Sequence, residues 1–173
     1  MMIEPAPHEL SRTAFITKFG GIYEHSSWVA ETLYDQGLSE DDGDPTRLAK
    51  RMAAIVDASG NERQMALLCA HPELAGKLAI SGSLTAESAA EQASAKLDKY
   101  SAKEFAEFHA LNEQYQKKFG HPFIIAVRGL DRKTILAIFR KRVTYSKNVE
   151  FANAFKEVHK IALQRIKRLV NFN

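Results

Sequence analysis

The stretch SAKEFAEFHALNEQYQKKFG, residues 101 to 120, decides the fold class because it carries every local signal of a long helix. Ser101 and Glu104 have the spacing of a capping box, which predicts the start of the helix, and Gly120 predicts its end. Between them an apolar stripe recurs at helical spacing, made of Phe105, Phe108, Leu111, Tyr115 and Phe119. The same periodicity fills almost the whole chain, so the sequence predicts an all-α protein.

Seven further helices follow from the same signals, which gives about eight in total. Residues 73–84 hold two glycines and two serines, which predicts a mostly irregular loop. For residues 121–129, HPFIIAVRG, the pattern is compatible with a buried extended segment or with a tight helical turn. The predicted starts of the other helices are Ser11, Ser26 or Ser27, Leu48, Asn61, Thr85, Asp131 and about Asn148.

Length and composition indicate one helical-bundle domain over residues 1–173, of which 45% are hydrophobic. The 24 basic and 21 acidic residues give a net charge of +3, too even to indicate nucleic acid or a membrane as partner. The single cysteine, Cys69, excludes an intrachain disulfide framework and multi-cysteine metal clusters, so a cytoplasmic location is expected. No apolar run approaches the roughly 20 residues of a membrane span, and the sequence shows no secretory signal.

Candidate chemistry lies at a break in the helical pattern, where His71 is followed at once by Pro72. On the next predicted helix Ser88, Glu91 and Gln92 fall at i, i+3 and i+4, so they share one face among small alanines. These residues are also compatible with two alternatives to a ligand site. Spacing alone favours a capped, solvated surface helix, and the His71 ring can instead bond a free carbonyl at a helix end.

Arg165 falls inside the apolar stripe of the last helix, together with residues such as Phe155, Val158 and Ala162. An inward guanidinium needs a carboxylate partner or an anionic ligand, unless it extends to the surface. Cys69 is expected to be a small core residue rather than a nucleophile. The other histidines show no metal-ligand spacing and are expected at or near the surface: His8, His25, His109, His121 and His159.

Three stretches, in this order and spacing, resemble the family of 2-oxo-4-hydroxy-4-carboxy-5-ureidoimidazoline (OHCU) decarboxylases. They are AHPELAGK (70–77), LTAESAAEQASAKLD (84–98) and NEQYQKKFGHPFIIAVRG (112–129). Each motif alone is weak, but their combination is specific and spans nearly the whole chain. His121 departs from many relatives, which carry an apolar or aromatic residue there.

The resemblance implies a role for each matching residue. His71 resembles the catalytic histidine and Glu91 the second catalytic group, with Pro72 lining the pocket. Ser88 and Gln92 resemble substrate contacts, and Arg165 resembles an arginine directed into the site. A strand-like segment is expected to bind the substrate through its main chain, and consists of Phe123, Ile124, Ile125, Ala126 and Val127.

The activity that the resemblance implies is decarboxylation of OHCU to S-allantoin and carbon dioxide, the last step in converting urate to allantoin. A carbon–nitrogen double bond in this substrate can accept the electrons that carbon dioxide leaves behind, so no cofactor and no metal is expected. The family also suggests a homodimer. Without the resemblance, the pattern favours a helical binding or regulatory module. A third alternative is a cofactor-free ureide hydrolase, in which the same His71 and Glu91 would activate water.

Overall fold

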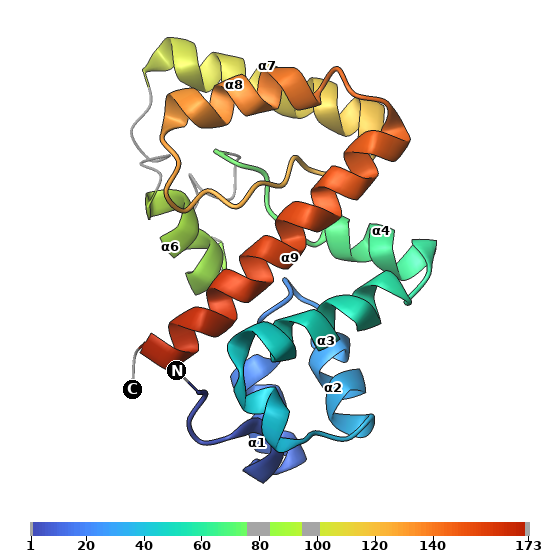
Figure 1. Ribbon diagram of the computed structural model, residues 1–173. Coiled ribbons are helices and arrows are strands. Elements are labelled where there is room, and N and C mark those ends of the chain that lie inside the picture. The colour runs from blue at the N-terminus through green and yellow to red at the C-terminus, as the bar shows by residue number, and fades with distance from the viewer. Residues whose placement is uncertain (1, 76–83, 95–100, 172–173) are drawn as a thin grey trace. The chain divides into compact units, whose positions relative to one another are not determined.

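The structure is a computed structural model that describes residues 2–75, 84–94 and 101–171 (Figure 1). These residues form eight α-helices and two short 3-10 helices, with no strand among them, which confirms the predicted all-α class and helix number. None of the helices in these ranges is both long and apolar enough to cross a membrane. The chain divides into two compact units, Met1–Ala70 with His159–Asn173, and His71–Val158, which we call unit 1 and unit 2.

Unit 1 is built from short helices whose ends lie close to the predicted positions. Ser11 caps α1 by accepting a hydrogen bond from the main-chain N–H of Ala14, whereas Ser27 precedes α2 without making a capping bond. The prediction that Asn61 caps α4 is wrong by one residue, because Gly60 holds the N-cap position with a left-handed φ of 83°. The elements are η1 (Pro7–Glu9), α1 (Arg12–Phe19), α2 (Trp28–Asp35), η2 (Glu40–Gly43), α3 (Pro45–Asp57), α4 (Asn61–Cys69) and the second half of α9 (Lys147–Asn171).

Cys69 corrects one prediction, because it is exposed rather than part of the core. Its neighbours Leu67 and Leu68 are fully buried. Successive helical residues are turned by about 100° around the axis, so the residue after a buried pair readily faces solvent. The helical spacing that included Cys69 in the apolar stripe therefore extended that stripe one residue too far.

Unit 2 contains α6 (Ala86–Ser94), α7 (Ala102–Phe119), α8 (Arg132–Arg142) and the first half of α9. Ser101 and Glu104 form the predicted capping box of α7, Gly120 ends it with a left-handed φ of 80°, and Asp131 caps α8. Helices α7 and α8 pack side by side (Figure 1). Of the predicted stripe on α7, only Phe105 is exposed, at 38%.

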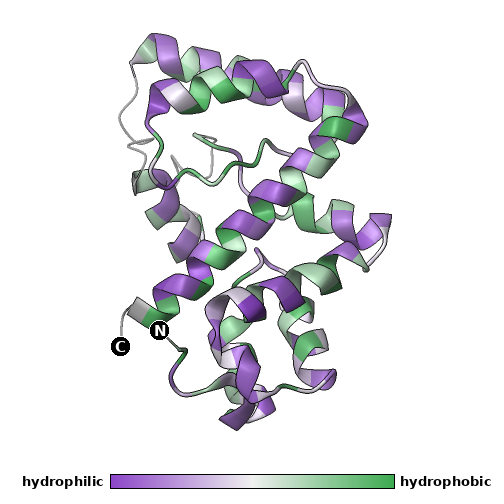
Figure 2. Cartoon of the chain, viewed as in Figure 1, coloured by the Kyte–Doolittle hydropathy of each residue, from purple (hydrophilic) through white to green (hydrophobic). Residues whose placement is uncertain are grey.

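Two connecting segments complete unit 2. Residues 121–127 form no helix, which settles the undecided pattern in favour of an extended course, and Figure 2 shows them as a largely hydrophobic trace. The predicted loop 73–84 is irregular at Glu73–Ala75, and its residues 76–83 lie outside the described ranges. His121 corrects the expectation of a surface position, because it is 1% exposed and its ring stands edge-on to that of Tyr115 at 5.5 Å.

Candidate active site

Helix α6 buries its polar residues and exposes its alanines. Ser88, Glu91 and Gln92 are only 4%, 8% and 7% exposed, so the solvated surface helix that spacing alone favoured is wrong. The outward positions are held by Ala86, Glu87, Ala89, Ala90 and Ala93. Burying a polar side chain costs free energy unless it is hydrogen-bonded in the protein or to a ligand. The polar face of α6 is therefore turned into the protein, and its residues are candidates for contacts with a ligand.

Gln92 connects α6 to the loop that follows His71. Its Oε1 accepts the N–H of Ala75 at 3.2 Å, and its Nε2 donates to the carbonyl of Glu73 at 3.3 Å. Ala75 has a left-handed φ of 53°, which costs a residue with a side chain about 1–2 kcal/mol. The bond from Gln92 stabilises this turn, a structural task that sequence analysis did not foresee. An amide retains one more N–H and further lone pairs, which can bind a ligand.

The loop is also fastened to α7. Asn112 donates from Nδ2 to the carbonyl of Leu74 at 2.9 Å and is itself 4% exposed. Its Oδ1 is buried and has no hydrogen-bond partner among the described residues. Sequence analysis missed Asn112, although its position three residues before Tyr115 and one after Leu111 places it beside the buried stripe of α7.

His71 lies directly before this fastened loop and is buried, with 8% exposed, while Pro72 is half-buried. Consecutive Cα atoms are 3.8 Å apart, so the Cα of His71 lies within roughly 8 Å of the Cα of Glu73. Because Gln92 binds the carbonyl of Glu73, the loop places His71 near the part of α6 that carries Glu91. The sequence-predicted catalytic pair thus belongs to two directly bonded elements.

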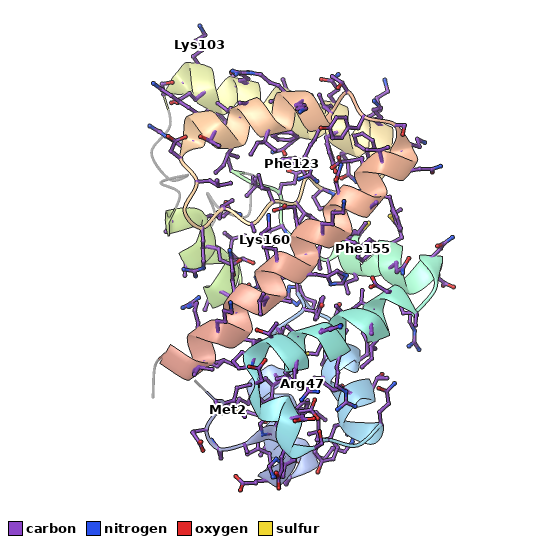
Figure 3. All side chains as sticks on the ribbon, in the orientation of Figure 1. Met2, Arg47, Lys103, Phe123, Phe155 and Lys160 are labelled. Atoms are coloured by element: carbon purple, nitrogen blue, oxygen red, sulfur yellow. The ribbon has the colours of Figure 1, made fainter. Side chains whose placement is uncertain are left out.

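The extended segment Phe123–Val127 reaches the same loop through the hydrophobic core. All five residues are buried, and Phe123, Ile125 and Val127 share one core cluster with Leu74 and Ala75. Phe123, which Figure 3 labels, lies in this unit. Its ring stacks on that of Phe139 of α8, with the ring centroids 3.8 Å apart. The loop after His71 is therefore bonded to helix α6 and shares a core cluster with this segment, all within unit 2.

A buried ion pair supports the segment from the other side. Arg142 donates from Nη1 to the carbonyl of Ile124 at 2.7 Å and from Nε to Glu150 at 2.9 Å. Glu150 is fully buried and also accepts the hydroxyl of Tyr115. Burial, followed by the bond to Glu150, raises the pKa of Tyr115, which keeps the phenol a neutral donor. Sequence analysis missed Arg142, although it follows Phe139 by three positions and so continues the apolar face of α8.

Two more charged residues touch or adjoin the segment. Glu157 accepts the N–H of Ala126 at 2.8 Å. Arg128 directly follows the segment, and its Nε and Nη2 are buried without a hydrogen-bond partner in the described part of the chain. A buried guanidinium requires an acceptor, so Arg128 is a candidate to bind an anionic or carbonyl group of a ligand.

The family comparison agrees with these elements, because the model of the OHCU decarboxylase family matches residues 8–167. The chain belongs to the OHCU decarboxylase family. A 2-oxo-4-hydroxy-4-carboxy-5-ureidoimidazoline decarboxylase of Haloferax volcanii is 38% identical over 92% of this chain and 90% of its own length. The protein of the same name from Halalkalicoccus jeotgali is 36% identical over 94% and 88%. A crystal structure of (S)-allantoin synthase superposes with a TM-score of 0.75 at 32% identity, covering 94% of this chain and 52% of that one.

Arg165, which the resemblance to OHCU decarboxylases assigned to the substrate, belongs to unit 1. It is 4% exposed, so it does not extend to the surface, and it pairs with Glu24 at 2.9 Å. Its Nη1 also lies 3.4 Å from the carbonyls of Gly21 and Ile22. The carboxylate partner that an inward arginine needs is therefore present, and a contact of Arg165 with substrate stays a prediction.

Metal ligation finds no support among the described residues of this family member. No group of three or more histidine, cysteine, aspartate or glutamate side chains in those ranges could hold an ion. The elements linked by these contacts carry an imidazole, a carboxylate, a hydroxyl, amides and main-chain dipoles. Such a set can transfer a proton and bind a neutral or anionic ring through hydrogen bonds.

Proposed function

We propose that this chain is a carboxy-lyase that converts OHCU to S-allantoin and carbon dioxide, the last step of urate-to-allantoin conversion, without cofactor or metal. The family model and the named relatives agree on the family, and the observation that carries the proposal is the buried polar face of α6. That face carries Glu91 and is bonded through Gln92 to the loop after His71. A solvated surface helix would expose these side chains, and a binding module would show no turnover of OHCU.

In this reaction the protein must orient the substrate and deliver a proton to one face of a ring carbon. The bond between the ring carbon and the carboxylate breaks, and its electron pair moves into the neighbouring carbon–nitrogen double bond as carbon dioxide leaves. This shift forms a carbon–carbon double bond, and the ring nitrogen takes up a proton. The resulting enol is then protonated on one face of the neighbouring carbon, which carries the ureido group and so acquires the S configuration, while the hydroxyl loses its proton and becomes the ring carbonyl. Protonated His71 serves as the acid and stabilises the developing negative charge, and Glu91 bonds the substrate hydroxyl or the imidazole.

Binding is assigned to the groups around this pair. Ser88 and Gln92 project from the buried face of α6, and Pro72 lines the site beside His71. The main chain of Phe123–Val127 binds the imidazoline and ureido groups. Arg165 keeps its proposed contact with the substrate from the resemblance alone. Arg128 is supported by its buried Nε and Nη2, which have no hydrogen-bond partner among the residues that the structure describes.

Circular dichroism of freshly prepared OHCU tests the proposal, because the enzyme yields S-allantoin whereas the unaided decay yields a racemate. His71→Ala and Glu91→Ala are expected to lower the turnover number about 100-fold or more and to leave the helical spectrum unchanged. His109→Ala and Glu113→Ala are the matched controls, since these two residues form an exposed pair on α7. Wild-type turnover in both site variants would refute the assigned roles, and no turnover by the wild type would refute the function.

The proposal includes a homodimer in the cytoplasm. The family resemblance supports the dimer, and the single cysteine supports a reducing compartment. Sedimentation of the purified protein tests the first part, with a monomer at micromolar concentration as the contrary result. Localisation of the tagged protein tests the second.

A further inference from the structure

The main chain of the extended segment has two edges with different partners. In an extended chain, the N–H and C=O of one residue point to one edge, and those of the next residue point to the other. Ile124 and Ala126 therefore share an edge. This edge is occupied by side chains of opposite charge, because Arg142 donates to the carbonyl of Ile124 at 2.7 Å and Glu157 accepts the N–H of Ala126 at 2.8 Å.

The opposite edge belongs to Phe123, Ile125 and Val127. The carbonyl of Val127 accepts a bond from the N–H of Leu130 at 3.0 Å, which closes a turn. The N–H and C=O of Ile125 make no hydrogen bond with any residue that the structure describes. A donor beside an acceptor on one residue is complementary to an amide or ureide that presents the reverse pair.

The supports of the first edge are connected through helix α9. Arg142 is 6% exposed and its guanidinium lies 4.5 Å from the centre of the Phe123 ring, while Glu150 neutralises it in the core. Glu157 belongs to α9, the same helix that carries Glu150 about two turns earlier. One helix thus contributes to both contacts that hold the segment, and hence to the direction in which Ile125 presents its polar groups.

We propose that Glu157 and Arg142 are positioning residues, which hold one edge of Phe123–Val127 so that the N–H and C=O of Ile125 face the ureido group of the substrate. This inference rests on the proposed function and adds two residues to its binding apparatus. Neither side chain is assigned a contact with the substrate. Their effect is to orient a main-chain donor and acceptor before binding, which lowers the ordering cost of the complex.

Glu157→Met and Glu157→Gln form the decisive pair of variants. Methionine keeps the length of the side chain and removes the acceptor, whereas glutamine keeps an acceptor oxygen for Ala126. Loss of binding that is equal in the ground state and the transition state raises KM and leaves kcat unchanged. We expect Glu157→Met to raise KM roughly tenfold, about the effect of one hydrogen bond, with kcat within about twofold of wild type, and Glu157→Gln to restore most of the loss.

Amide hydrogen exchange supplies a second measurement that does not depend on turnover. The N–H of Ala126 is expected to exchange faster in Glu157→Met than in wild type, and at nearly the wild-type rate in Glu157→Gln. The double variant Arg142→Met with Glu150→Met removes the other support without leaving an unpaired buried charge, and is expected to raise KM as well. Both kinetic tests are ratios to the wild type, whose own turnover decides the proposed function separately.

Three results would overturn the inference. Unchanged KM in Glu157→Met with faster exchange at Ala126 would show that the position of the segment does not govern binding. Equal impairment of the methionine and glutamine variants would show that the acceptor is not the relevant property. A loss confined to kcat would place Glu157 in the chemistry rather than in positioning.

Discussion

The two connecting segments of the candidate site are held by different kinds of hydrogen bond. The loop Glu73–Ala75 is held by the neutral amides of Gln92 and Asn112. The segment Phe123–Val127 is held by the charged side chains of Arg142 and Glu157. One site is therefore assembled from a loop whose supports have no titrating group and a segment whose supports depend on charge.

This difference predicts that loss of a charged support lowers the free energy of unfolding more than loss of a neutral one. Loss of an amide leaves main-chain groups unpaired, which costs about 1–3 kcal/mol in a buried place. Loss of one member of a buried ion pair leaves an uncompensated charge, which costs about 3–5 kcal/mol. A buried ion pair contributes little net stability compared with an apolar substitute, so its value here is to specify the position of the segment.

The largest effect is expected from breaking the buried ion pair between Arg142 and Glu150, which supports the extended segment. Arg142→Met should lower the free energy of unfolding by about 3–5 kcal/mol, because Glu150 stays charged and fully buried. The double variant Arg142→Met with Glu150→Met should lower the free energy of unfolding less, because it leaves no unpaired buried charge. Urea denaturation measures the stability of both variants. A double variant as unstable as Arg142→Met would show that the unpaired charge of Glu150 is not the cause of the loss.

Arg140 provides the matched control, since it lies on α8 two residues before Arg142 and also pairs with a glutamate. Its partner is Glu107 at 2.6 Å, and the two side chains are 54% and 32% exposed, whereas those of Arg142 and Glu150 are 7% and 0% exposed. Water screens such a pair, so Arg140→Met should leave the unfolding curve unchanged within error. If Arg140→Met lowered the free energy of unfolding as much as Arg142→Met, burial would not explain the difference between the Arg140–Glu107 and Arg142–Glu150 pairs.

An intermediate effect is expected from removing the neutral hydrogen bonds that hold the loop Glu73–Ala75. Gln92→Met removes both bonds to the loop and should lower the free energy of unfolding by about 1–3 kcal/mol. It should also reduce activity, because the left-handed turn at Ala75 loses its support. Gln114→Met, on the exposed face of α7, is the control. Full activity and stability in Gln92→Met would show that the loop is held by other contacts.

Local sequence signals explain why most of the helices could be predicted. The capping residues Ser11, Ser101 and Asp131 act within one helical turn of themselves, so a short window contains the complete interaction. The course of residues 121–127 could not be decided in this way. Its carbonyl and N–H partners, Arg142 and Glu157, lie 18 and 31 positions away from the groups that they bind.

The candidate site shows the same limit. The motifs indicated His71, Ser88, Glu91 and Gln92, and the structure brings their elements together. Burial of the polar face of α6 could not be predicted, because spacing reveals that residues share a face but not what that face contacts. Inward arginines were recognised at Arg165 and missed at Arg142, although both follow apolar residues at helical spacing.

The smallest effect, a dependence on pH, should arise in the extended segment. Burial lowers the pKa of His121, at the start of the extended course, against the opposing influence of the Pro122 carbonyl and Glu150, while Arg142 lowers it further. The unfolded chain then binds more protons than the folded one below pH about 6.5, so stability falls as the pH drops from that value towards the folded pKa. His121→Phe should reduce this slope in urea denaturation followed from pH 7 to 5, since the remaining titrating groups are common to both proteins. A slope in His121→Phe as steep as that of the wild type would show that the buried imidazole at the start of the extended segment does not cause the loss of stability in acid.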